Sequence, residues 1–166
     1  MKKIILTLFG GFIISFSFGQ IERGAMLVGA SSNFGLNREN PSPSTGNHIT
    51  TLNLDVKGGY FVINNLAAGL RFNYNRTYRD GPSYGSTSVG IFGRYYYQGK
   101  FFGGIGITSV GPSSGNTYTE FPIEVGYAAF ITKNIAIEPS LNFVKGDSQN
   151  VIGLNFGFSL YLNRGK

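Results

Sequence analysis

The segment from Val151 to Leu162 alternates strictly between two kinds of side chain. A period of two predicts a β-strand, because successive side chains of a strand point to opposite faces. Small or polar residues, such as Gly153 and Ser159, occupy one of these faces. The even-numbered positions on the other face are all large and apolar: Ile152, Leu154, Phe156, Phe158, Leu160 and Leu162. Such a strand must separate two environments, either a protein core and water or lipid and a polar interior.

The same alternation recurs along the chain and predicts eight strands, at 24–36, 49–60, 66–78, 86–98, 101–110, 118–130, 135–144 and 151–162. Short turns alternate with longer, turn-rich connections at 37–48, 79–85, 111–117 and 146–150. An even number of strands, each about ten residues long, with longer loops at one end is typical of outer-membrane barrels. Pro122 and Pro139 each remove one ladder hydrogen bond, so we expect a bulge or strand end near each.

The first nineteen residues have the features of a secretory signal peptide. Lys2 and Lys3 precede an apolar stretch at 4–18, and Ser17 and Gly19 supply the small residues of a cleavage site. We expect cleavage after Gly19, which leaves one domain at 20–166. A membrane-anchoring helix is the less favoured interpretation, because the stretch is shorter than the ~20 apolar residues that a spanning helix needs. The exported chain has no cysteine, so no disulfide can staple its fold.

The charged residues indicate which face of the sheet is the interior. They share a face with Asn, Ser, Thr and many of the glycines, whereas the opposite face carries Leu, Ile, Phe and Tyr. The interior of an eight-stranded barrel is just wide enough for side chains to fill it. The small, charged face therefore suits the inside and the bulky apolar face suits lipid. The predicted fold is all-β: an eight-stranded antiparallel up-and-down transmembrane β-barrel in the bacterial outer membrane.

Seven charged residues are predicted to lie in the lumen. Unpaired charge is costly in so narrow a space, so we expect them to form an ion-pair network that plugs the lumen. The partners cannot be read from the sequence. The alternative is a narrow channel, in which switching pairs gate a path for protons or ions. The seven residues are Asp55, Lys57, Arg71, Arg94, Glu120, Glu124 and Glu138.

In its strand pattern the whole predicted domain resembles the small eight-stranded outer-membrane β-barrel proteins of Gram-negative bacteria, the OmpX-like and OmpA-transmembrane-like group. In that family the last strand carries a recognition signal for the barrel-assembly machinery. Asn155, Gly157, Leu160 and Leu162 are similar to this signal. The chain departs from it by using Leu at both closing positions and by continuing through 163–166. The resemblance implies that the assembly machinery is a partner during biogenesis.

The remaining features favour a monomer without enzymatic activity, with a structural or surface-interaction role in contact with outer-membrane lipid. The formal net charge of +6 includes Lys2 and Lys3, and no basic cluster interleaves with aromatics, so nucleic acid is not an expected partner. No metal or cofactor motif is present. Four basic residues predicted near the loop end are candidates for contact with lipopolysaccharide phosphates: Arg38, Arg76, Arg79 and Lys145.

Two further functions stay open at this point. His48, the single histidine, could meet Asp80 or Ser83 at the outer rim, as in barrel enzymes that modify lipid A, although no motif supports this. An exposed loop histidine is the simpler interpretation. Alternatively, a secreted soluble barrel would bury the apolar face and bind an apolar ligand.

Overall fold

The computed structural model describes residues 20–34, 50–78, 84–145 and 150–163, and these form one antiparallel sheet. The predicted signal peptide lies outside the described residues, as do His48, Asp80 and Ser83. Within the described part, no helix is long and apolar enough to cross a membrane. The strands are β1 (Met26–Phe34), β2 (Thr50–Ile63), β3 (Leu66–Tyr78), β4 (Tyr84–Tyr97), β5 (Phe101–Pro112), β6 (Tyr118–Tyr127), β7 (Ala129–Phe130), β8 (Ile135–Lys145) and β9 (Asn150–Leu162).

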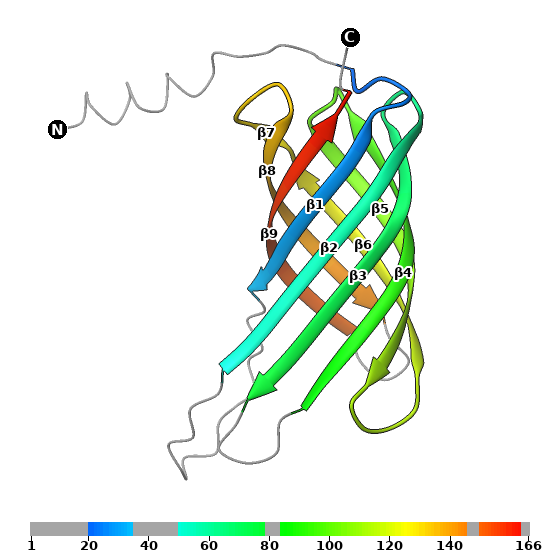
Figure 1. The fold of residues 1–166 in the computed structure, drawn as a ribbon, viewed down its shortest axis with the longest axis vertical. Coiled ribbons are helices and arrows are strands. Elements are labelled where there is room, and N and C mark those ends of the chain that lie inside the picture. The colour runs from blue at the N-terminus through cyan, green and yellow to red at the C-terminus, as the bar shows by residue number, and fades with distance from the viewer. Residues whose placement is uncertain (1–19, 35–49, 79–83, 146–149, 164–166) are drawn as a thin grey trace, which may run out of the picture.

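The sheet closes on itself into a barrel (Figure 1). Neighbouring strands pair in chain order, and β1 also pairs with β9 along its whole length, from Met26 opposite Leu162 to Phe34 opposite Leu154. β1 begins and β9 ends at the same end of the barrel. The predicted eight-stranded, up-and-down, antiparallel barrel is confirmed.

The sixth predicted strand, 118–130, is not continuous. It breaks at Ala128 into β6 and the two-residue β7, and both pieces pair with β8. The amide of Ala128 donates to the carbonyl of Lys100 instead of to β8. The pairing to β8 is interrupted opposite Pro139 and Glu138, between the Gly126–Ser140 pair and the Ala129–Ile137 pair, and resumes in the same register. β6 and β7 together occupy one position in the wall, so the ring has eight positions.

Pro122 also lies within a strand and interrupts its ladder. The β5–β6 register runs from Phe101 to Ile105 and resumes at Thr108, which leaves Gly106 and Ile107 without assigned partners opposite Pro122. Proline has no N–H to donate, so a gap is expected at this point. Both prolines therefore mark interruptions of the ladder, as the sequence predicts.

Tight turns connect the strands at the end where β1 begins. Asn65, between β2 and β3, has φ 65°, and Gln98 and Gly99, between β4 and β5, have φ 52° and 65°. Two consecutive left-handed residues match the type I′ turn, whose twist suits a two-residue hairpin and whose second position favours glycine. We call this end of the barrel the short-turn end and the opposite end the loop end.

The two faces of the sheet lie as the alternation predicts. Ile152, Ile105 and Leu70 on the outer face are 72%, 68% and 65% exposed, whereas Asp55 and Arg94 on the inner face are 0% and 2% exposed. A water-soluble barrel would place these two sets the other way round. The predicted inside-out arrangement is therefore confirmed for the described strands.

Candidate functional site

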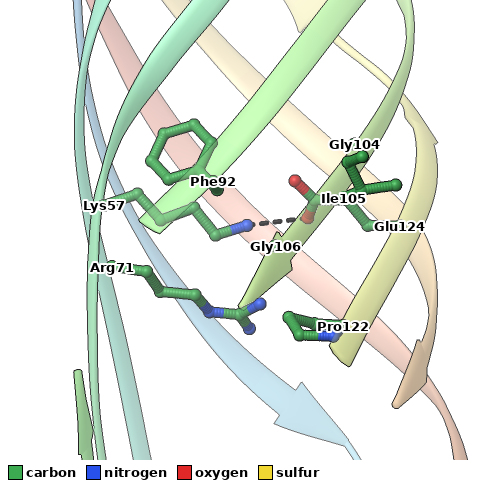
Figure 2. Close-up of a pocket in the computed structure, with 8 residues that line it drawn as sticks. All are labelled: Lys57, Arg71, Phe92, Gly104, Ile105, Gly106, Pro122 and Glu124. Carbon is green, nitrogen blue, oxygen red and sulfur yellow. Dashed lines mark hydrogen bonds and ion pairs between the residues drawn. The ribbon is translucent and has the colours of Figure 1, made fainter. Parts of the chain in front are cut away.

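The centre of the lumen is crossed by an ion pair between opposite walls. The Nζ atom of Lys57, on β2, lies 2.7 Å from Oε2 of Glu124, on β6 (Figure 2). β2 and β6 are four positions apart in a ring of eight, so these two side chains span the lumen. Both side chains are more than nine-tenths buried. A lysine stem and a glutamate therefore occupy the path along the axis.

Arg94, on β4, joins two carboxylates. Its Nη2 atom lies 2.7 Å from Oε1 of Glu124, and its Nη1 atom lies 2.7 Å from Oε2 of Glu138 on β8. Its Nε atom also donates to Oε1 of Glu124, at 2.8 Å. The face of the guanidinium lies over the Phe102 ring, with Cζ 4.2 Å from the centroid. A planar, multidentate cation suits a site that must satisfy two buried anions at once.

Gly104, on β5, makes the contact between Arg94 and Glu124 possible. Arg94 and Glu124 are its direct cross-strand partners on the two sides, so their side chains must meet over it. A Cβ atom at position 104 would lie 2.9 Å from both Cγ and Oε1 of Glu124. Absence of a side chain here is therefore a condition of the network.

A second ion pair lies nearer the loop end. Arg71, on β3, makes a two-atom contact with the carboxylate of Asp55 on β2, with Nε donating to Oδ1 at 3.1 Å. The direct cross-strand partner of Arg71 is Lys57, and like charges in that position repel. Each of the two cations turns to a carboxylate of its own, Asp55 for Arg71 and Glu124 for Lys57, which offsets the repulsion.

Six of the seven predicted lumen residues make ion pairs in the structure, and Glu120 does not. Glu120 is only half-buried, and among the described residues it makes no ion pair. Its side chain hydrogen-bonds Tyr118 at the start of β6. The physical reason is position: Glu120 lies close to the end of its strand, where solvent already satisfies a carboxylate.

Two tyrosines belong to the network and were not predicted. Nη1 of Arg94 donates to the hydroxyl of Tyr96 at 3.1 Å, and the hydroxyls of Tyr96 and Tyr161 hydrogen-bond each other at 3.0 Å. The Tyr161 hydroxyl also donates to Oε1 of Glu138. The signal in the sequence is parity, because Tyr96 lies two positions from Arg94 and therefore shares its inward face.

The short-turn end of the lumen contains an apolar and aromatic cluster, which we call the aromatic plug. The Phe61 and Tyr96 rings are 5.5 Å apart, and the Tyr96 and Tyr161 rings pack edge-on at 6.0 Å. Inward alanines fill the remaining space. The plug consists of Ile21, Ala25, Leu27, Phe61, Ala67, Phe92, Tyr96, Phe102, Ala128, Ala136 and Tyr161.

Residues before the first strand complete this plug. Ile21 is fully buried, and its amide donates to Oδ1 of Asn65 at 2.9 Å while its carbonyl accepts from the amide of Asn65, also at 2.9 Å. The amide of Arg23 donates to Oδ1 of Asn64 at 2.8 Å. The chain before β1 is thus tied across the β2–β3 turn, and the Ile21 side chain enters the end of the barrel.

The space left beside the network is small. A cavity of only about 10 Å³ lies beside the network (Figure 2). It is lined by Lys57, Arg71, Phe92, Gly104, Ile105, Gly106, Pro122 and Glu124. About this much volume is needed for a single water molecule. This cavity therefore has no room for a solute larger than one water molecule.

The four residues of the predicted assembly signal divide between the two faces of β9. Asn155 is buried and Gly157 half-buried on the inner face, whereas Leu160 and Leu162 lie on the outer face. The arrangement is that of an ordinary wall strand, and recognition by the assembly machinery stays a prediction. Arg38 and Arg79 lie outside the described residues, whereas Arg76 and Lys145 lie at exposed positions near the loop end. Among the described residues, no group of three or more His, Cys, Asp or Glu side chains is placed to hold a metal ion.

Comparisons with known proteins bear on the fold. No protein-family model and no curated protein matches the sequence. The structure resembles the outer membrane protein Ail of Yersinia pestis, with a TM-score of 0.56 and 14% identity over 84% of this chain and 100% of that one. It also resembles the N-terminal β-barrel domain of Pseudomonas aeruginosa OprF, with a TM-score of 0.57 and 12% identity over 84% and 98% of the two chains. OprG of the same organism matches with a TM-score of 0.50 and 10% identity over 87% and 95%.

The chain has the fold of a small outer-membrane β-barrel. The likeness extends over nearly the full length of each of these barrels, so the resemblance expected from the strand pattern is confirmed as a likeness of fold. Together with the apolar outer face, it makes this an integral outer-membrane β-barrel protein and supports the predicted location. The alternative of a soluble barrel with an apolar ligand inside is wrong, because the apolar face points outward and the lumen holds buried charges.

Proposed function

We propose that the protein is a non-enzymatic outer-membrane barrel whose lumen is closed, and that it serves envelope structure or surface contact rather than transport. The observation that carries this proposal is the pair of barriers in series along one narrow lumen. The ion-pair network crosses the middle, and the aromatic plug fills the short-turn end. A solute would have to displace both.

The chemistry of the network supports a permanent closure. Its six members carry three positive and three negative charges, and every one of these side chains contacts an opposite charge. Breaking a buried pair leaves an uncompensated charge in a low-dielectric interior, which costs about 3–5 kcal/mol. The population of a state with the pairs broken is therefore small.

Conductance in planar lipid bilayers tests the closure. The refolded protein should give no stable pore of the size that a general porin gives. Opening both barriers in the variant Lys57→Ala/Arg94→Ala/Phe61→Ala/Tyr96→Ala should introduce measurable conductance, whereas Lys57→Ala/Arg94→Ala alone should not, because the aromatic plug stays in place. Tyr95→Ala is the matched control, since Tyr95 neighbours Arg94 but lies 53% exposed on the outer face. A porin-sized conductance from the unmodified protein would contradict the proposal, and small discrete openings would favour the narrow-channel alternative.

The absence of enzymatic activity is part of the proposal and has its own test. Among the described residues, the six charged side chains of the network pair with one another. Mass spectrometry of lipid A from cells with and without the protein should show the same acylation pattern. A pattern that changes with the protein and reverts in His48→Ala would instead establish a lipid A-modifying enzyme.

The contact surface is the part of the barrel that meets lipid. Ail, which has this fold, is described in a phospholipid bilayer nanodisc. For this chain we propose the same kind of surroundings, with lipopolysaccharide phosphates near the basic loop-end residues and the barrel-assembly machinery as a partner during insertion. We propose a monomer, because the ring of strands is closed and leaves no strand edge whose backbone groups need a partner from a second copy.

A further inference from the structure

Three basic residues lie at the short-turn end of the barrel, one at each of three connections. Arg23 lies beside the β2–β3 turn, Lys100 lies in the β4–β5 turn, and Lys133 lies between β7 and β8. The described part of this end exposes one acidic residue, Glu22. The cations therefore outnumber the acid, and they are spread around the rim of the barrel rather than gathered on one side (Figure 1).

Backbone hydrogen bonds fix the point from which each cation extends. The amide of Arg23 donates to Oδ1 of Asn64 at 2.8 Å. The amide of Lys100 donates to the carbonyl of Tyr97 at 3.2 Å and closes the β4–β5 turn. Lys133 lies in the turn before β8, which is closed by its own backbone hydrogen bonds. The three positive charges are therefore held at set places on the rim.

Each cation is accompanied at its connection by an exposed apolar side chain. All three of these apolar side chains are more than half exposed, which lipid tolerates and water does not favour. They indicate that the hydrocarbon region of the bilayer reaches the level of the turns, which places the cations among the lipid headgroups. The pairs are Arg23 with Ile63, Lys100 with Phe101, and Lys133 with Ile131.

The outer face supplies hydroxyl groups at the same end. The exposed tyrosines of the described outer face lie near the short turns, whereas its exposed rings toward the loop end are phenylalanines. A tyrosine hydroxyl can donate to the phosphate and ester oxygens of a lipid, and a phenylalanine cannot. The tyrosines are Tyr60, Tyr95 and Tyr97, and the phenylalanines are Phe72, Phe121 and Phe143.

The charge of this rim favours one class of lipid. The short turns of outer-membrane barrels face the periplasm, and the leaflet on that side consists of phospholipid. A zwitterionic headgroup carries an ammonium group of its own, which the three cations repel. An anionic headgroup offers them only the negative phosphate, so basic residues at a membrane surface bind it preferentially.

We propose that the short-turn end binds the headgroups of anionic phospholipids through Arg23, Lys100 and Lys133. The exposed apolar side chain at each connection contacts the acyl chains of the same leaflet, and the neighbouring tyrosines donate to its ester and phosphate oxygens. This goes beyond the proposed function, which places lipid phosphates only at the loop end. Both ends of the barrel then contact phosphate, each through residues of its own.

Native mass spectrometry of protein released from vesicles tests the proposal. The vesicles contain equal parts of phosphatidylglycerol and phosphatidylcholine, and the retained lipids are counted for each variant. The test variant is Arg23→Gln/Lys100→Gln/Lys133→Gln, and Arg76→Gln/Lys145→Gln is the control that removes cations from the loop end. We expect the preference for phosphatidylglycerol to fall about fivefold or more in the test variant, because one basic residue near an anionic surface already accounts for about that factor.

The control fixes the meaning of each outcome. A preference that is lost in the loop-end control and kept in the test variant would overturn the proposal. So would an equal preference in all three proteins, which would instead indicate that the short-turn cations serve a partner in the aqueous compartment.

A second measurement uses the unmodified protein and needs no variant to fold. NMR spectra are compared in nanodiscs of phosphatidylcholine alone and in nanodiscs with one quarter phosphatidylglycerol. The amide signals of Arg23, Lys100 and Lys133 should shift more than those of Arg76 and Lys145, and the shifts should shrink as salt is added. Equal shifts at the two ends, or larger shifts at the loop end, would contradict the proposal.

Discussion

At the scale of single residues, two adjacent glycines on β5 point to opposite faces of the sheet. Gly103 points outward, where the nearest atom to an added Cβ is a backbone oxygen at 4.0 Å. Gly104 points inward, beneath the contact between Arg94 and Glu124. Because the two lie in one strand with similar pairing, they form a natural control for each other.

Gly104→Val should weaken the barrel and Gly103→Val should not. A valine at 104 must displace the Glu124 side chain, which loosens its contacts with both Arg94 and Lys57, so we expect the free energy of unfolding to fall by about 3 kcal/mol. The change for Gly103→Val should stay within about 0.5 kcal/mol. Urea titration in lipid vesicles, followed by the loss of heat-modifiable gel mobility, measures both. Equal losses would show that Gly104 has no special role.

The sequence predicts which charges face inward but not which of them meet. Period-two alternation places Asp55, Lys57 and Arg71 correctly because it depends only on local chain geometry. The pair of Lys57 with Glu124 depends on the curvature and stagger of the closed wall, which no single strand encodes. Tyr96 and Tyr161 were missed because tyrosine at a strand end is equally typical of the outer membrane interface.

At the scale of strands, the pairing ladder is continuous between some neighbouring strands and interrupted between others. β3 and β4 pair without a gap from Leu66 opposite Tyr95 to Thr77 opposite Tyr84. The ladder from β5 to β6 skips two residues opposite Pro122, and the ladder from β6 and β7 to β8 breaks opposite Pro139. The proline positions were readable from the sequence, whereas the interruption at Ala128, whose amide donates to the carbonyl of Lys100, was not.

Amide hydrogen exchange should follow this difference. Interrupted ladders open locally at lower free energy than continuous ones. We expect the slowest-exchanging amides in the central parts of β3 and β4, and faster exchange in β5 around Gly106 and in β8 around Ile137. NMR in lipid nanodiscs transferred to deuterated water measures this residue by residue. Uniform protection around the whole ring would contradict the expectation.

At the scale of the whole molecule, the apolar belt replaces the buried core that a soluble protein of this length would have. The packed interior is mostly polar, apart from the aromatic plug at the short-turn end. Fold class and the inside-out arrangement were predictable because composition, strand length and charge placement agree. The docking of Ile21 was not, because residues 20–25 carry no alternation that would place them inside the barrel.

Spin labels on β9 test the arrangement as a whole. Labels at Leu154 and Phe156, both about half exposed on the outer face, should relax with dissolved oxygen, which concentrates in the bilayer. A label at Asn155, between them on the inner face, should be shielded from it. Power-saturation measurements in vesicles, with an aqueous nickel chelate as the second relaxer, give both accessibilities. Efficient relaxation of the Leu154 and Phe156 labels by the chelate would rule out a lipid-facing surface.

The ion pair from Lys57 to Glu124 has a consequence for how the molecule is made. Its two ends are 67 residues apart and lie on opposite walls, so a flat or half-curled sheet cannot form it. Until the sheet curls far enough, Lys57 lacks its carboxylate, whereas Arg71 already has Asp55 on the neighbouring strand. Partly curled assembly intermediates are therefore less stable than the closed barrel. The ion pair that crosses the lumen thus also stabilises the closed barrel relative to these intermediates.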